Sequence, residues 1–140
     1  MADPRWLDPT VDPSDRVPGT CYLGDPKVVN DGPVGLARFT TLRSWLSQWS
    51  YDDARGDAQK AAAGVTVPVL VVGNTADDAC TPSHTRRLFD SVPHENKAFY
   101  EVAGATHYYT GPNGRAQMNE AIGVVTEFLA AHLSPGSTAE

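Results

Sequence analysis

Residues 65–72 read Val-Thr-Val-Pro-Val-Leu-Val-Val, and residues 73–78 follow as Gly-Asn-Thr-Ala-Asp-Asp. The apolar residues are consecutive rather than alternating, and most are β-branched, which is typical of a strand covered on both faces. Such strands belong to parallel sheets, so the segment predicts an α/β fold. Pro68 is compatible with this prediction if it precedes the paired part of the strand. Asp77 and Asp78 then stand at the C-terminal end of the strand, where α/β sheets gather ligands and catalytic groups.

The residues after this strand predict one crossover unit. Thr81 and Pro82 are expected as the N-cap and first residue of a helix over Ser83–Ser91, and a second strand is expected at Lys97–Val102. Strand, helix and strand in so few residues indicate a right-handed connection between parallel neighbours. The next loop, Ala103–Pro112, contains His107.

A long helix over Arg115–His132 is predicted to close this unit. Its apolar residues recur at helical spacing and are expected on its buried side: Met118, Ile122, Val125, Phe128 and Leu129. Residues 65–133 therefore form the predicted α/β segment, and 134–140 form a polar tail.

The first 64 residues have a different character and are predicted to be an irregular, partly helical, cap-like or linker region. Residues 1–33 are rich in Pro, Asp and Gly, so irregular structure is expected there. From Pro33 onward, helical spacing predicts a helix that Asp31 and Pro33 begin and that carries Leu36, Phe39, Leu42, Trp45, Leu46 and Trp49. A short helix is expected at Gln59–Ala63, ending at Gly64.

Composition and charge exclude several classes of function. A net charge of -6 and the lack of a Lys/Arg cluster argue against binding to nucleic acid or to an anionic membrane. The longest apolar run is too short to span a bilayer, and the first ten residues do not resemble a signal peptide. We therefore expect a cytoplasmic protein, although a missing N-terminus would also remove any signal. Cys21 and Cys80 are expected to be free thiols.

No metal site is predicted. Asp52, Asp53 and Asp57 lie close together in the sequence, but no other type of ligand accompanies them at useful spacing. Carboxylates in a polar stretch of this kind usually form a solvated face or cap helices.

Two motifs resemble the α/β-hydrolase superfamily. Val67–Gly73 followed by Asp78-Ala79-Cys80-Thr81-Pro82 resembles that family's penultimate strand and acid loop, and Gly104-Ala105-Thr106-His107 resembles its histidine loop. The resemblance covers Val65–Leu133, about half of the chain. It implies the C-terminal portion of a serine esterase or peptidase that hydrolyses a small-molecule ester or amide without a cofactor.

The resemblance implies that His107 is the catalytic histidine and that Asp78 is the acid. Pro82 favours Asp78, because family members often show an acid, two residues, an apolar residue and then proline. Thr81 in the apolar position departs mildly from that pattern, and the adjacent Asp77 remains the alternative acid.

Chemistry supports the pair independently of the family. A serine hydroxyl becomes a good nucleophile when a neutral imidazole accepts its proton, and the imidazole needs a carboxylate that holds its tautomer. The alternative is that Asp78 caps a turn and His107 is an ordinary loop residue. Other candidates are less suitable. His84, His94 and His132 are expected at turns or helix ends facing solvent, Cys80 is expected to be a structural thiol, and Ser83 is expected in a helix cap.

The nucleophile is the missing part. No serine in the 140 residues lies in a Gly-x-Ser-x-Gly setting, and no strand that could carry one is predicted before residue 65. The chain is then expected to be a fragment of a longer enzyme, a subunit completed by the missing N-terminal part of the hydrolase, or a remnant. A non-catalytic interaction or ligand-binding module is the alternative function.

Overall fold

The structure is a computed structural model that describes residues 10, 15–17, 20, 24–32, 40–50 and 52–133. In the described part, the elements are α1 (Pro26–Asp31), α2 (Leu42–Trp49), α3 (Ala58–Ala62), β1 (Val69–Asn74), α4 (Pro82–Ser91), β2 (Lys97–Val102) and α5 (Gly114–His132). Within these ranges, no helix combines the length and the apolar content that crossing a bilayer requires.

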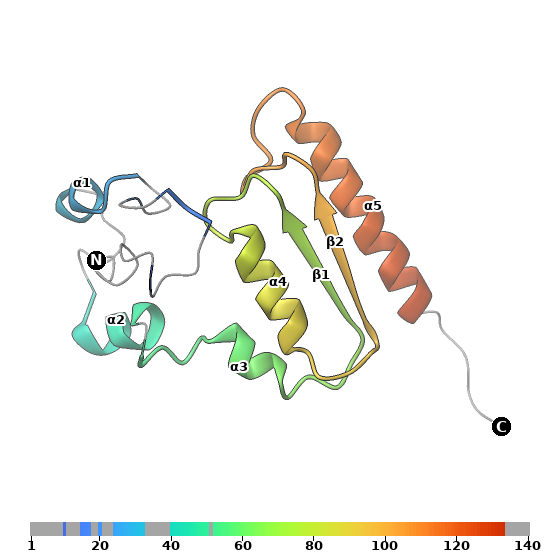
Figure 1. Cartoon of the computed structure of the whole chain (residues 1–140), viewed down its shortest axis with the longest axis horizontal. Helices are drawn as coiled ribbons and strands as arrows, with labels where there is room; N and C mark the ends of the chain where they lie inside the picture. Colours follow the sequence, from blue (N-terminus) through green and yellow to red (C-terminus); the bar gives the residue numbers. More distant parts are fainter. Residues whose placement is uncertain are drawn as a thin grey trace.

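The two strands form a small parallel sheet. Val69 lies opposite Lys97, and the register continues to Asn74 opposite Val102. α4 connects the strands and packs on β1, while α5 contacts both strands from the other side of the sheet (Figure 1). Helices of this kind around a parallel sheet are compatible with the predicted α/β class.

The first strand begins later than predicted. The expected strand spanned residues 65–72, whereas β1 spans Val69–Asn74. Pro68 has no N–H to donate, so the ladder starts immediately after it, where the Val69 N–H donates to the Asn96 carbonyl at 3.1 Å. The predictions for α4 and β2 agree with the structure, with α4 one residue longer at its start.

Close packing of α4 on β1 depends on a glycine. A Cβ built at Gly73 would lie 2.9 Å from the Thr85 Oγ1. Real Cβ atoms essentially never lie so close to another heavy atom. Glycine in a strand interior commonly marks such an approach of another element. Helix and strand can therefore lie against each other directly behind the loop that carries the two aspartates.

The predicted buried face of α5 is wrong in most of its residues. Four of the residues expected inside are exposed by 39 to 55%: Met118, Ile122, Val125 and Leu129. α5 instead buries Gly114 and Ala121, whose small side chains let it approach the sheet, and Phe128 is half-buried. Because the sheet has two strands in the described part of the chain, it covers one narrow side of the helix. The core at this contact consists of Val102, Ala105 and Ala121.

The N-terminal region contains helical structure that the sequence analysis did not predict. α1 forms inside the stretch expected to be irregular, because the Asp25 carboxylate accepts the N–H groups of Lys27 and Val28. Asp31 therefore ends α1 and does not begin the next helix. The N-cap of α2 is Thr41, whose hydroxyl oxygen accepts the Ser44 N–H at 3.2 Å.

Some expectations for this region fall outside the described residues: the first part of the predicted helix, residues 33–39, together with Cys21 and the tail 134–140. The short helix expected at residues 59–63 is confirmed as α3, which the Asp57 carboxylate caps.

Candidate active site

The loops that follow β1 and β2 lie side by side at one edge of the sheet. This follows from the parallel register, because both strands end at the same edge. Backbone hydrogen bonds extend the pairing beyond the strands: the Thr75 N–H donates to the Val102 carbonyl at 3.2 Å, and the Ala76 N–H donates to the Ala105 carbonyl at 3.0 Å. The acid loop and the histidine loop are therefore joined to each other.

Side chains add two further links. The Gly104 N–H donates to the Thr75 Oγ1 at 2.7 Å, and the Asn74 Nδ2 donates to the Thr106 carbonyl at 3.1 Å. Asn74 and Thr75 were not predicted as site residues from the sequence. Their position at the end of a buried strand is the only signal that the sequence offers.

His107 pairs with Asp77. Its Nδ1 lies 3.0 Å from one carboxylate oxygen of Asp77 and 3.2 Å from the other. Asp77 is buried, with 8% of its surface exposed, whereas the His107 side chain is 33% exposed. The carboxylate also accepts the N–H groups of Ala79 and Cys80 at 2.8 and 2.9 Å, so its orientation is fixed before the imidazole approaches.

The pairing lies one residue earlier than the sequence pattern indicated. Asp78 was the expected partner, but its side chain is exposed and lines a neighbouring pocket. The reason is the turn after β1, in which the Asp77 N–H donates to the Asn74 carbonyl at 3.2 Å. That turn directs the Asp77 carboxylate inward. The two adjacent residues are of the same type, and the position of Pro82, which favoured Asp78, indicates the wrong one.

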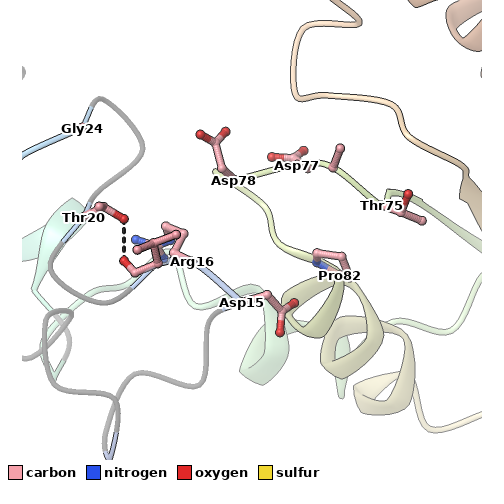
Figure 2. Close-up of a pocket in the computed structure, with 10 residues that line it drawn as sticks. Asp15, Arg16, Thr20, Gly24, Thr75, Asp77, Asp78 and Pro82 are labelled. Carbon is pink, nitrogen blue, oxygen red and sulfur yellow. Dashed lines mark hydrogen bonds between the residues drawn. The ribbon is translucent and has the colours of Figure 1, made fainter.

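The pocket beside the acid loop has a volume of about 430 Å³ and lies between two parts of the chain far apart in sequence. Asp15, Arg16 and Thr20 line one side, and Asp77 and Asp78 face them from the loop after β1 (Figure 2). His107 does not line this pocket. The pocket therefore adjoins the Asp77 carboxylate and not the His107 imidazole.

Two tyrosines follow the histidine. The Tyr108 ring packs edge-on against the His107 ring, with centroids 4.8 Å apart, and Tyr108 is 70% exposed. Tyr109 has a φ of 52°, a left-handed conformation that bulky residues rarely adopt. Its carbonyl oxygen lies where a Cβ of residue 114 would be, so Gly114 is needed for α5 to begin there.

The remaining sequence candidates lie elsewhere. His132 is exposed, as predicted, with its Nδ1 against the Phe128 carbonyl, whereas His84 and His94 are half-buried. Both ring nitrogens of His94 are enclosed by protein without a hydrogen-bond partner. In the described ranges, no group of three or more His, Cys, Asp and Glu residues is placed to hold a metal ion.

Cys80 differs from expectation, and Ser83 agrees with it. Cys80 is exposed rather than buried, and partial burial of the thiol, followed by the negative charge of Asp77, raises its pKa above the ordinary 9.0. A raised pKa makes Cys80 a poor nucleophile. Ser83 belongs to the helix cap as predicted, but through its N–H, which donates to the Asp15 carboxylate at 2.7 Å.

Comparisons of the chain with protein-family models, with curated proteins and with solved structures give no match.

Proposed function

We propose that this chain carries the acid and the base of a serine-hydrolase active site, with the α/β-hydrolase arrangement of these two groups. The observation that carries the proposal is the contact between the His107 Nδ1 and the buried Asp77 carboxylate. The two residues come from consecutive loops at the C-terminal edge of a parallel sheet, in the order acid and then histidine. The motif around His107 supports the same assignment, whereas the acid-loop motif favoured the adjacent Asp78.

The geometry gives each residue a role. When the neutral imidazole donates its Nδ1 proton to Asp77, the lone pair is on Nε2. In the proposed reaction, Nε2 of His107 takes the proton of a serine hydroxyl as the serine attacks the carbonyl carbon of an ester or amide. Asp77 stabilises the imidazolium that forms, and Nε2 then returns the proton to the leaving group. The carbon–oxygen or carbon–nitrogen bond to the leaving group breaks in this step and leaves an acyl-serine. Water then attacks the acyl carbonyl while Nε2 takes its proton, and the ester bond to serine breaks as that proton passes to the serine oxygen, which releases the carboxylic acid.

The nucleophile is proposed to come from polypeptide outside these 140 residues. The sequence contains no Gly-x-Ser-x-Gly motif, and the same missing segment would supply the N–H groups that stabilise the oxyanion. The proposed substrate is a small-molecule ester or amide, and the proposed chemistry requires no cofactor.

The test uses a fluorophosphonate probe and a short-chain aryl ester. The full chain is assayed alone and with the polypeptide encoded upstream of it. We expect labelling and turnover only in the mixture. Substituting His107→Ala should abolish turnover, and Asp77→Asn should lower kcat by about 10⁴-fold, as loss of the orienting carboxylate does in such triads.

Asp78→Asn is the matched control for the register. Its carboxylate does not contact the imidazole, so this variant should retain turnover within a few-fold of the unmodified chain. Near-native turnover after His107→Ala or Asp77→Asn would overturn the proposal. Absence of labelling in the mixture would also count against it.

A second candidate function, a non-catalytic interaction module, is favoured by the exposed apolar residues of α5. Met118 and Ile122 are 41 and 55% exposed, and Leu129 on the same helix is 44% exposed. Exposed apolar residues on one helix commonly mark an interaction surface. Binding of the upstream polypeptide without any labelling or turnover would favour this function over the hydrolase.

A further inference from the structure

We propose that Asn74 is a positioning residue for His107, holding the imidazole in line with Asp77. This inference rests on the proposed function, because it assigns a role toward the same acid–base pair. Asn74 is the last residue of β1, three residues before Asp77. It therefore lies on the acid strand while its side chain reaches across to the histidine loop.

The contact of Asn74 is with the peptide group that leads into His107. The Asn74 Nδ2 donates to the Thr106 carbonyl at 3.1 Å, and that carbonyl belongs to the peptide bond whose nitrogen is that of His107. The same carbonyl accepts the Tyr109 N–H at 3.1 Å, which closes a turn around the histidine. Asn74 thus fixes the plane of the peptide group between Thr106 and His107, and with it the direction of the His107 side chain.

That turn needs support because it contains backbone strain. Tyr109 has positive φ, a conformation that is unfavourable for a residue with a bulky side chain. Inside the turn, the Thr110 N–H donates to the Thr106 Oγ1 at 2.9 Å. From the acid strand, the Asn74 amide is the side-chain donor that reaches the carbonyl of Thr106.

The other links between the loops lie farther from the histidine. Thr75 accepts the Gly104 N–H and Ala76 donates to the Ala105 carbonyl, so both secure the beginning of the loop. The Asn74 amide reaches this loop closer to the imidazole, at the peptide group that contains the His107 nitrogen. Its loss removes the hydrogen bond that ties the peptide group of His107 to the end of β1.

The surroundings of the Asn74 side chain indicate that its Nδ2 group, as a hydrogen-bond donor, is the part that matters to the fold. Its Oδ1 is enclosed by protein and has no hydrogen-bond partner, and an unsatisfied buried oxygen is destabilising. The preceding strand positions Val69–Val72 are aliphatic and carry no such cost. An amide at this position is therefore explained by the hydrogen bond that its nitrogen donates.

The test measures the tautomer of His107 and needs no nucleophile. In the ¹⁵N-labelled full chain, long-range ¹H–¹⁵N spectra report which ring nitrogen of each histidine carries the proton. The His107 signals are identified with the His107→Gln variant. We expect neutral His107 to be in the Nδ1–H form. In Asn74→Ala, the ratio of this form to the other should fall about five- to tenfold, the effect of one hydrogen bond.

Gln117→Ala is the matched control. The Gln117 Nε2 donates to the Ala103 carbonyl at 2.8 Å, so this variant also removes an amide-to-carbonyl bond from the histidine loop, but four residues before His107. Its tautomer ratio should equal that of the unmodified chain. Asn74→Asp keeps the size and removes the donor, so it should lower the ratio too, and it carries the test if Asn74→Ala does not fold.

The outcomes separate this inference from the proposed function. An unchanged ratio in the folded Asn74 variants overturns the positioning role while leaving the acid–base pair in place. Equal effects of Gln117→Ala and Asn74→Ala also overturn it, because the effect is then general to the loop. Absence of the Nδ1–H form in the unmodified chain contradicts the proposed function itself.

Discussion

At the scale of single residues, Asp77 organises the candidate site. Its carboxylate accepts two backbone N–H groups from its own loop as well as the contact with His107. Hydrogen bonds from these backbone N–H groups hold the buried carboxylate in place, so it does not have to reorient to contact the imidazole. Asp77 can therefore hold an imidazole in one orientation, whereas the exposed Asp78 lacks such a framework.

The charge of Asp77 also acts on Cys80. Burial and then the Asp77 charge raise the pKa of the thiol, so its reactive thiolate is scarce at neutral pH and increases only in alkaline solution. In a Cys21→Ser background, we expect Asp77→Asn to lower this pKa and to accelerate iodoacetamide modification of Cys80 at neutral pH. The rate is measured as a function of pH.

The control is Asp90→Asn, which removes an exposed carboxylate from the far end of α4. Its rate profile should match that of the Cys21→Ser protein. An identical profile for Asp77→Asn would show that the charge of Asp77 does not reach the thiol.

At the scale of elements, α4 receives a cap from a distant part of the chain. Thr81 is its N-cap residue, but the Thr81 hydroxyl makes no capping hydrogen bond. The Asp15 carboxylate accepts the Ser83 N–H instead, and the Asp15 N–H lies 3.5 Å from the Thr81 Oγ1. The N-terminal region is thereby attached to the helix that follows the acid loop.

Removing this cap should destabilise the protein. Asp15→Ala is expected to lower the free energy of unfolding by about 1 kcal/mol, the usual effect of losing a carboxylate cap. Urea unfolding measures the change. Asp25→Ala removes a local cap from α1, which does not contact the sheet, and should change the global transition less. Equal effects of the two variants would contradict a special link between Asp15 and α4.

At the scale of the whole molecule, the sheet is too narrow to cover its helices. α5 spans Gly114–His132, yet only Gly114 and Ala121 are buried along it. Met118, Ile122, Val125 and Leu129 form an exposed apolar stripe next to the buried side. Parallel sheets usually have more strands and cover both layers of helices. The chain therefore has apolar surface beyond what its own sheet buries.

The exposure of this stripe predicts a contrast between two neighbouring positions. Ile122→Gln should change the free energy of unfolding by less than about 0.5 kcal/mol, because the side chain is 55% exposed. Ala121→Gln should lower it by about 1–3 kcal/mol, because Ala121 is packed in the core. Urea unfolding of both variants gives the comparison. A loss for Ile122→Gln as large as for Ala121→Gln would mean that the stripe is covered in solution.

Much of the α/β segment could be predicted from local sequence. β1 follows from a β-branched run, α4 follows from Thr81-Pro82 at a helix start, and α3 follows from its Asp57 cap. β1 begins later than predicted, because Pro68 has no N–H to donate and hydrogen bonding between the strands starts after it. The buried side of α5 was predicted from periodicity alone, which reports where apolar residues gather and does not report whether a sheet is wide enough to cover them.

The sequence by itself determined the elements of residues 65–133, their order and the presence of an acid loop and a histidine loop at one edge of the sheet. These depend on short-range preferences and on the direction of parallel strands. Only the tertiary structure decided that Asp77 rather than Asp78 meets His107, that Asn74 reaches the histidine loop, and that Asp15 caps α4. Each of those contacts joins residues at least 30 positions apart, and their partners depend on turn geometry that residue types do not encode.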